Sequence, residues 1–322
     1  MYTPPFTVTD EILHLVSEIS EQIGTLNAFL GERMPSPMLR KENQIKTIHS
    51  SLAIEHNSLS LQQVTDVIDG KHVLGAPNEI QEVKNALQAY QLMLQLDAFS
   101  EADLLRAHSL MMADLVDNAG HYRKGSVGVF DGDKCIHVAP SADRVPTLMA
   151  ELFAWVKETK THPLISSCVF HYEFEFIHPF MDGNGRMGRY WQTLLLSRWK
   201  GIFAWLPVET IVKKYQQEYY QAIAQSDAKG DSTDFIVFML NCILQTIREQ
   251  RKVTDNVGIN VGINEQRVLD ALRADASLSA VKIGQLLGIT TRQAERLLAS
   301  LREKNLIRRI GANKNGHWEI IK

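Results

Sequence analysis

The sequence predicts a mainly α-helical protein with a small β-hairpin near its middle, followed by a short helical unit that ends in a second hairpin. Three observations lead to this fold class. Apolar residues recur at three- and four-residue steps over most of the chain. They alternate with polar residues instead in 127–138 and 306–321. The length of 322 residues fits two units of unequal size.

The first hundred residues are expected to form a helical region. The first helix carries an apolar stripe behind a candidate cap at Thr9, formed by Ile12, Leu15, Val16, Ile19 and Ile23. A second helix, over about 42–57, has an apolar face that continues towards Glu55. Ser60–Gln63 has the pattern of a capping box and opens a third helix that stops near Gly70. Further helices are expected around 80–94 and after Ser100, so the region spans 1–100.

A helical core is predicted over 101–252, interrupted by one hairpin. Val127 and Val129 alternate on one side of the turn signal Asp131–Asp133, and Ile136 and Val138 alternate on the other. Helical spacing then covers 144–160, 163–177, 187–199, 209–225 and 233–252, with Pro163 as a favourable first helical residue.

Residues 253–263 are predicted to be a linker, because they contain most of a doubled Val-Gly-Ile-Asn and no helical stripe. In 264–322 we expect three short helices, with Gly288 separating the second from the third and a capping box at Thr290–Gln293. Leu306–Ile310 and His317–Ile321 then indicate two strands. A helix-turn-helix followed by a hairpin is typical of a winged-helix domain.

Composition narrows the class of protein. The net charge is −3, but the segment after 263 holds 11 Lys and Arg against six Asp and Glu, so it is the basic part. Three scattered cysteines, Cys135, Cys168 and Cys242, argue against disulfides and structural zinc. The sequence has neither a signal peptide nor an apolar run of membrane-spanning length. We therefore expect a cytoplasmic protein without membrane contact.

The chemistry is concentrated in His178-Pro-Phe-Met-Asp-Gly-Asn-Gly-Arg-Met-Gly-Arg189, between two predicted helices. Gly183 and Gly185 leave backbone N–H groups open to a ligand at a helix N-terminus, where the helix dipole favours an anion. Arg186 and Arg189 lie one helical turn apart, and two guanidinium groups beside such amides suit a polyphosphate.

Two further residues of this segment suggest a reaction. Asp182 is an oxygen ligand suited to Mg²⁺ shared with phosphates, and His178 has the ordinary pKa of a general base. Together they suggest attack of a hydroxyl on phosphorus. A glycine turn with solvated arginines is the simpler alternative, but so many specified residues at fixed spacing disfavour it. Walker-loop and zinc-protease motifs are absent from the sequence.

The segment resembles the signature of Fic-domain proteins, His-x-Phe-x-Asp/Glu-Gly-Asn-Gly-Arg-x-x-Arg, with every specified position present. The resemblance implies a Fic helical core and transfer of AMP from ATP, with Mg²⁺, to Ser, Thr or Tyr hydroxyls of proteins, this chain included. It assigns His178 as the base and Asp182 as the metal ligand. It places the nucleotide against Glu55, Lys134, Cys135, Ile136, His137, Gly183, Asn184, Gly185, Arg186, Met187, Gly188, Arg189, Tyr219 and Asp227.

Two other stretches extend this resemblance. The predicted hairpin around Lys134–Pro140 is similar to the flap that holds the target segment. Ser51-Leu-Ala-Ile-Glu55 is similar to an inhibitory helix, although His56 departs from the usual Gly or Asn. The resemblance implies that Glu55, with Ser51, pairs with Arg189 and takes the guanidinium that would hold the γ-phosphate. It also leaves open that Glu55 orients a water that removes AMP from targets.

Alternatives differ in class. The chain could instead be a nucleotide-sensing, DNA-binding transcriptional regulator, because Arg292, Arg296 and Arg302 lie on or near the predicted recognition helix. A protein partner or dimerisation suits the winged helix equally well. A related transferase with another phosphate donor is the third alternative. The family resemblance further suggests a homodimer.

Overall fold

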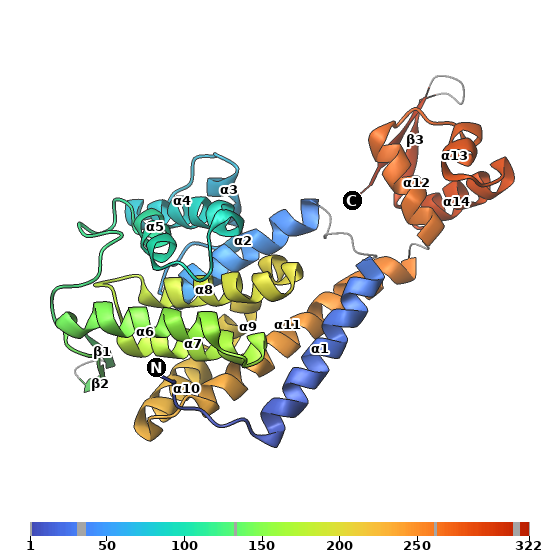
Figure 1. Ribbon diagram of the computed structural model, residues 1–322. Helices are drawn as coiled ribbons and strands as arrows, with labels where there is room; N and C mark the ends of the chain where they lie inside the picture. Colours follow the sequence, from blue (N-terminus) through green and yellow to red (C-terminus); the bar gives the residue numbers. More distant parts are fainter. Residues whose placement is uncertain (1, 31–36, 132–133, 261–262, 312–315, 322) are drawn as a thin grey trace. The chain divides into compact units, whose positions relative to one another are not determined.

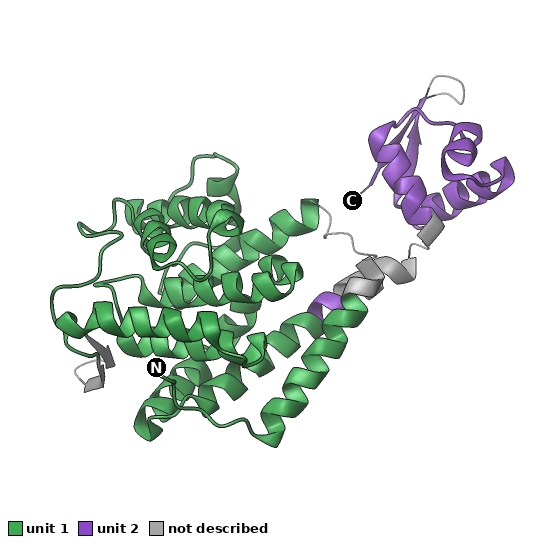
Figure 2. Ribbon diagram, in the orientation of Figure 1, with its two compact units in different colours: residues 1–248 green, residues 249–322 purple. Residues whose placement is uncertain are grey.

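The computed structural model describes residues 2–30, 37–131, 134–260, 263–311 and 316–321, without the side chains of 27–30, 128–138 and 252–264. It is mainly helical, as predicted (Figure 1). Two compact units divide the chain, one over Met1–Arg248 and one over Glu249–Lys322 (Figure 2). Among the described residues, no helix combines the length and apolar character needed to cross a bilayer.

The N-terminal helices are α1 (Asp10–Leu30), α2 (Pro37–Ile54), α3 (Leu61–Ile68), α4 (Pro77–Leu92), the short 3₁₀ helix η1 (Met93–Gln95) and α5 (Glu101–Met111). The capping box at Ser60 and Gln63 is confirmed. Ser100 caps α5, where its hydroxyl accepts a bond from the N–H of Asp103. The second helix ends at Ile54, so Glu55 lies in the turn just beyond it rather than within it.

The predicted hairpin is present as an antiparallel pair, β1 (Gly128–Asp131) and β2 (Lys134–Val138). Gly128 pairs with Val138, and Asp131 pairs with Lys134. The register shifts between Val129 and Phe130. The centre of the predicted turn, 132–133, lies outside the described residues.

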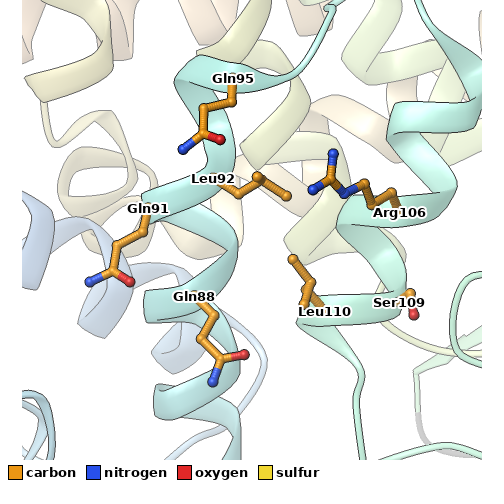
Figure 3. A pocket seen from close by; sticks show the side chains of 7 residues that line it. All are labelled: Gln88, Gln91, Leu92, Gln95, Arg106, Ser109 and Leu110. Carbon is orange, nitrogen blue, oxygen red and sulfur yellow. The ribbon is translucent and has the colours of Figure 1, made fainter.

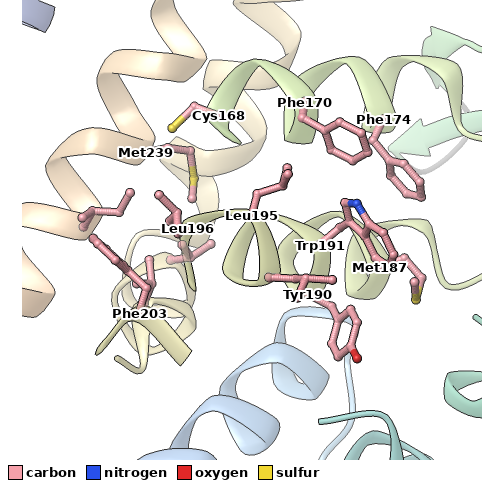
Figure 4. Packing of buried hydrophobic residues seen from close by; sticks show 14 of the residues in the cluster. Cys168, Phe170, Phe174, Met187, Tyr190, Trp191, Leu195, Leu196, Phe203 and Met239 are labelled. Carbon is pink, nitrogen blue, oxygen red and sulfur yellow. The ribbon is translucent and has the colours of Figure 1, made fainter. Parts of the chain in front are cut away.

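The core of the first unit forms around two adjacent helices, α7 (Pro163–Ile177) and α8 (Asn184–Trp199). They follow η2 (Ala142–Arg144) and α6 (Val145–Glu158). Figure 4 shows the aromatic and aliphatic side chains that pack between α7, α8 and their neighbours. Complete burial of several aromatic rings makes this pair of helices the rigid part of the unit. The loop between them is the predicted active-site segment.

The remaining helices of the first unit are η3 (Gly201–Trp205), α9 (Val208–Lys214), α10 (Gln216–Lys229) and α11 (Thr233–Asn260). The helix predicted over 209–225 is therefore two helices, which meet at Tyr215. The predicted linker begins too early, because α11 continues to Asn260.

The second unit contains α12 (Ile263–Ala274), α13 (Ala280–Leu287), α14 (Thr291–Glu303), β3 (Ile307–Ile310) and β4 (His317–Ile320). The predicted capping box at Thr290 and the left-handed Gly288 are both present. The two strands pair antiparallel. Val268, Ile283, Leu298 and other apolar residues form a separate small core. Whether this unit acts as a winged helix remains a prediction.

Candidate active site

The segment 178–189 is a tight corner between α7 and α8. His178 ends α7 in the left-handed region, with φ 50°, and its N–H donates to the carbonyl of Phe174 at 2.9 Å. Gly183 precedes α8 with φ 81°, and a side chain there would also collide with Met112. Phe180 is fully buried and holds the middle of the corner in the core. The side chain of His178 is half-buried, so a solvent-borne group can approach it.

Asn184 fixes the shape of this corner through its side chain. Its Oδ1 accepts from the N–H of Phe180 and its Nδ2 donates to the carbonyl of Phe180, both at 2.9 Å. The family resemblance had placed Asn184 on the phosphates. In this structure both ends of its side-chain amide shape the loop, and its place on the phosphates stays a prediction that its backbone N–H at the start of α8 can still meet.

Arg123, which the sequence did not single out, holds the start of the corner. Its Nε donates to the carbonyl of His178 at 2.7 Å, and its Nη2 to the carbonyl of Ile177 at 3.3 Å. The same guanidinium donates to the carbonyls of Gly125 and Pro140, on either side of the hairpin. Arg123 is 2% exposed, and this burial lowers its pKa. One side chain therefore fixes His178 and both ends of the hairpin segment.

His108 on α5 holds the other half of the corner. Its Nδ1 accepts from the N–H of Gly120 at 2.8 Å, so its Nε2 carries the hydrogen and donates to the carbonyl of Asp182 at 3.1 Å. Its ring stacks on Phe180 with centroids 3.6 Å apart. Burial lowers the pKa of His108 to about 4, which keeps the ring neutral at physiological pH. A lone histidine in a helix gave no signal for this role.

Arg189 and Glu55 form the ion pair that the family resemblance implies. Nη2 of Arg189 donates to Oε1 of Glu55 at 2.8 Å and to the carbonyl of Ser51 at 3.0 Å. Its Nε donates to the hydroxyl of Ser51 at 3.2 Å. Burial acts to lower the pKa of Arg189, but Glu55 and other acidic neighbours outweigh it and raise the pKa. The guanidinium therefore stays charged and is bound by the segment 51–55 through Nε and Nη2, while its buried Nη1 has no hydrogen-bond partner among the described residues.

Arg186, the other arginine of the corner, also contacts acidic groups. Its Nη1 donates to Oε1 of Glu82 at 3.1 Å, and its Nη2 donates to Oδ1 of Asp182 at 3.2 Å. The side chain of Asp182 is 59% exposed, whereas that of Arg186 is 5% exposed. Both arginines of the predicted anion site are thus held by carboxylates.

The position of Glu55 is set by α9 and α10, which bind the last carbonyls of α2. Nζ of Lys213 donates to the carbonyl of Ala53 at 2.7 Å, and Nε2 of Gln216 to the carbonyl of Ile54 at 2.8 Å. The carbonyl of Ala53 also accepts from the N–H of His56 at 3.3 Å, and the two side chains add donors at the negative end of α2. Glu55 leaves this end of α2 aimed at Arg189.

Two glycines of α8 are required by close approach. A Cβ at Gly185 would collide with Oε1 of Glu55, and a Cβ at Gly188 would lie 2.7 Å from Oε1 of Glu175 and Cδ2 of His171. Gly188 therefore allows α7 and α8 to approach each other. Because Gly185 has no side chain, the space beside Arg189 can accept either a glutamate or a phosphate. Met187, by contrast, is fully buried in the core and offers only its backbone.

Tyr219 and Asp227, which the family resemblance places against the nucleotide, both contact α7. Tyr219 is 1% exposed and its hydroxyl lies 3.1 Å from Nε2 of His171. Asp227 accepts a bond from the hydroxyl of Tyr172 at 2.8 Å. Both groups are thus engaged with α7. The side chains of Lys134, Cys135, Ile136 and His137 lie outside the described residues, although the backbone of β2 is present as predicted.

A metal at this site would depend on a single protein carboxylate. Within the described ranges, no three His, Cys, Asp or Glu side chains converge on one point. Asp182 is exposed beside the N-terminus of α8, which fits Mg²⁺ held jointly by one carboxylate, phosphate oxygens and water.

An open groove between α4 and α5, lined by Gln88, Gln91, Leu92, Gln95, Arg106, Ser109 and Leu110, contains no residue of the corner (Figure 3).

Comparisons with known proteins converge on one family. A sequence model described as the Fic/DOC family matches residues 98–196. A Fic family protein from Desulfovibrio desulfuricans G20 has a crystal structure that superposes with a TM-score of 0.77, covering 99% of this chain and 98% of that one at 46% identity. A Fic domain-containing signaling protein from Bacteroides thetaiotaomicron, at 18% identity and a TM-score of 0.58 over 74% and 95% of the two chains, shares the fold.

Curated relatives carry the name protein adenylyltransferase Fic. The relative from Aedes aegypti is 27% identical over 241 residues, which cover 71% of this chain and 46% of the relative. The relative from Nematostella vectensis is 27% identical over 245 residues, which cover 72% and 55%. This chain thus spans about half the length of the curated relatives it matches.

Proposed function

Because this chain belongs to the Fic family, we propose that it is a protein adenylyltransferase, which moves AMP from ATP to a Ser, Thr or Tyr hydroxyl of a protein, itself included. The observation that carries this proposal is the corner 178–189, whose backbone is fixed by buried side chains and whose two arginines lie beside the amides of α8. Such a preformed anion site at a helix N-terminus suits a triphosphate.

In the proposed reaction His178 is the general base. Nδ1 of His178 lies 3.4 Å from the carbonyl of Glu175, which can only accept, so Nδ1 carries the ring hydrogen and Nε2 is the basic nitrogen. Nε2 takes the proton of the target hydroxyl as its oxygen bonds to the α-phosphorus. The bond from that phosphorus to the bridging oxygen breaks, and pyrophosphate leaves. Arg123, bound to the carbonyl of His178, keeps the ring in position.

Charge stabilisation falls to the other residues of the corner. Arg186 and the backbone of Gly183, Asn184 and Gly185 would face the phosphates, and Arg189 would hold the γ-phosphate. The N–H of Gly183 now donates to Oδ1 of Asp182, so it would have to exchange this carboxylate for a phosphate oxygen. Asp182 would hold Mg²⁺, which when bound offsets the charge of the triphosphate and of the leaving pyrophosphate. In this proposal Tyr219 and Asp227 lie towards the adenine, and the hairpin 128–138 pairs with the target segment.

We propose further that Glu55 inhibits the transfer. Its carboxylate occupies the guanidinium that the γ-phosphate would use, and α2 is held in that position by Lys213 and Gln216. A nucleotide can still enter, but with its triphosphate displaced. Removal of AMP from targets by a water that Glu55 orients is a second proposed activity of this site.

Labelled ATP with Mg²⁺ tests the transfer directly. We expect Glu55→Gly to raise covalent labelling of the chain at least about tenfold, because a paired charge at a partly buried site contributes more than 1 kcal/mol. His178→Ala in the same background should abolish it. Intact mass must increase by one AMP, since a gain of phosphate alone would indicate the alternative transferase. Absence of labelling in Glu55→Gly with ATP demonstrably bound would contradict the proposal.

The nucleotide-sensing DNA regulator is less favoured, since a sensor has no need of a general base at position 178. In the second unit, Lys304 is paired with Glu265 and Arg308 with Glu319, which leaves less free positive charge than the sequence suggested. Arg292, Arg296 and Arg302 are nevertheless exposed on α14. We keep DNA or a protein as the proposed partner of this unit.

A further inference from the structure

Glu82 on α4 is one of two acidic groups that hold Arg186, and no motif in the sequence pointed to it. Its Oε1 accepts from Nη1 of Arg186 at 3.1 Å. The side chain of Glu82 is 19% exposed and that of Arg186 is 5% exposed. The pair is therefore screened less by water and salt than a surface ion pair.

The second oxygen of Glu82 binds the segment that carries Glu55. Oε2 of Glu82 accepts from Nδ2 of Asn57 at 2.8 Å. Asn57 is 8% exposed, and its Nδ2 also donates to the carbonyl of Glu79. One short stretch of chain thus contacts both arginines of the corner: Glu55 contacts Arg189 directly, and Asn57 reaches Arg186 through Glu82.

The carboxylates around Arg186 affect how strongly this arginine can attract the triphosphate of a nucleotide. Two of the nitrogens of Arg186 face carboxylates, Glu82 and Asp182, and its Nε is buried without a hydrogen-bond partner. A guanidinium neutralised in this way attracts a triphosphate weakly, and a phosphate oxygen must displace a carboxylate to reach it. The side chain of Asp182 is 59% exposed, and its Oδ1 shares its contact with Arg186 with the N–H of Gly183. Glu82 is only 19% exposed, and its second oxygen is anchored by Asn57. Glu82 is therefore the carboxylate that keeps Arg186 from the ligand.

We propose that Glu82 is a positioning residue that sets the affinity for ATP by restraining Arg186, and that Asn57 couples this restraint to the segment of Glu55. The proposal rests on the function proposed above for the corner 178–189. In this proposal the inhibited state has two separate contacts, that of Glu55 with Arg189 and that of Glu82 with Arg186. Removal of Glu55 alone then leaves the nucleotide bound below its full affinity.

Glu82→Gln tests the restraint, because it keeps the size and removes the charge. The variant is made in the parent chain and in the Glu55→Gly background, and binding of a non-hydrolysable ATP analogue with Mg²⁺ is measured by calorimetry. In the Glu55→Gly background we expect the Kd to fall about three- to tenfold. The KM for ATP in AMP transfer should fall by a similar factor, with kcat within about twofold.

Glu79→Gln is the matched control. Glu79 lies one turn earlier on α4 and accepts from the N–H of Ser58, so it contacts the same segment without contacting Arg186. It should leave the Kd unchanged. Equal thermal midpoints will show that the variants are folded, and Glu82→Ala serves as a second variant that should shift the Kd in the same direction.

Two results overturn the inference. A Kd that is unchanged in both Glu82 variants means that the restraint has no effect, and a weaker Kd means that Glu82 holds Arg186 in its productive place. The failure of the proposed function looks different, since every variant then binds the analogue but none is labelled. In that case the Kd values still decide the role of Glu82.

Discussion

The corner 178–189 and the segment 51–57 meet at the same site but are held in different ways. The corner is fixed by buried side chains that bond to its backbone, namely Arg123, His108 and Asn184. The segment is held at its last carbonyls by Lys213 and Gln216, two long side chains from other helices. Glu55 itself is about one third exposed, at 32%.

This difference indicates which part of the site keeps a fixed conformation and which part can move. Bonds to a buried backbone cannot break without leaving unpaired polar groups, so the corner keeps its shape with or without ligand. Contacts through flexible, partly exposed side chains break at small cost. Under the inhibition proposed above, we therefore expect relief by displacement of the segment 51–57 rather than by rearrangement of the corner.

The largest effect on AMP transfer is expected from Arg123→Lys, which would disrupt the corner 178–189. Lysine keeps the charge but cannot bond four carbonyls at once, so His178 would shift. We expect kcat/KM for AMP transfer to fall about 100-fold in the Glu55→Gly background, since a small misplacement of a catalytic group has an effect of this size. Arg106→Lys, at an exposed position on α5, is the control. A loss of less than about twofold would show that the corner does not need Arg123.

His108→Phe is expected to have a smaller effect, with a pH dependence of its own. It keeps the stack on Phe180 but leaves the N–H of Gly120 and the carbonyl of Asp182 unpaired, which costs about 1–3 kcal/mol of stability at pH 7.5. Burial lowers the pKa of His108 in the fold to about 4, below the 6.5 that is usual for a histidine side chain. Between these values only the unfolded chain takes up the proton, so the parent loses stability as the pH falls.

Urea unfolding of both proteins from pH 7.5 to 4 measures this loss. All other titrating groups are common to the two chains, so the difference between them isolates His108. The stability advantage of the parent should fall by about 3 kcal/mol over the range, because each unit of pKa shift is equivalent to about 1.4 kcal/mol. It should therefore vanish or reverse near pH 4. Parallel stability curves would mean that His108 titrates normally and does not hold the corner.

Lys213→Met is expected to have the smallest effect, and it concerns the segment 51–57 at the end of α2. Loss of the bond to the carbonyl of Ala53 loosens the end of α2, and AMP transfer should rise about two- to fivefold. Lys214→Met, whose cation lies over the ring of Tyr215, is the matched control and should change nothing. In the Glu55→Gly background Lys213→Met should give no further gain. A gain there would mean that Lys213 acts on the corner itself.

Periodicity and capping patterns predicted most of the fold. The boxes at Ser60 and Thr290, the hairpin and the glycine corner lie where the local pattern placed them, because each depends on neighbouring residues. The second helix ends at Ile54, before the predicted end near 57. Two later boundaries were also wrong: the break at Tyr215 was missed, and α11 continues past 252. Continuous apolar spacing hid the first, and the repeated glycines suggested a linker at the second.

The motif residues of the site were likewise visible in the sequence, because they are clustered within twelve positions. Its supporting residues were not. Arg123, His108 and Glu82 come from three separate parts of the chain, and as isolated charged or polar residues they look like ordinary surface groups. Only the packing of α4, of α5 and of the segment between α5 and β1 against the corner reveals that their polar ends meet there.

The bare Cα of Gly185 has a consequence for how this protein can change over evolution. A Cβ there would collide with the carboxylate of Glu55, and under the proposed function it would also lie beside the triphosphate. Under the same proposal, a substitution at this position that displaced Glu55 would also weaken nucleotide binding. Variants with altered control are expected to arise in α2, α4 and α9, which leaves the chemistry and its regulation free to diverge at different rates.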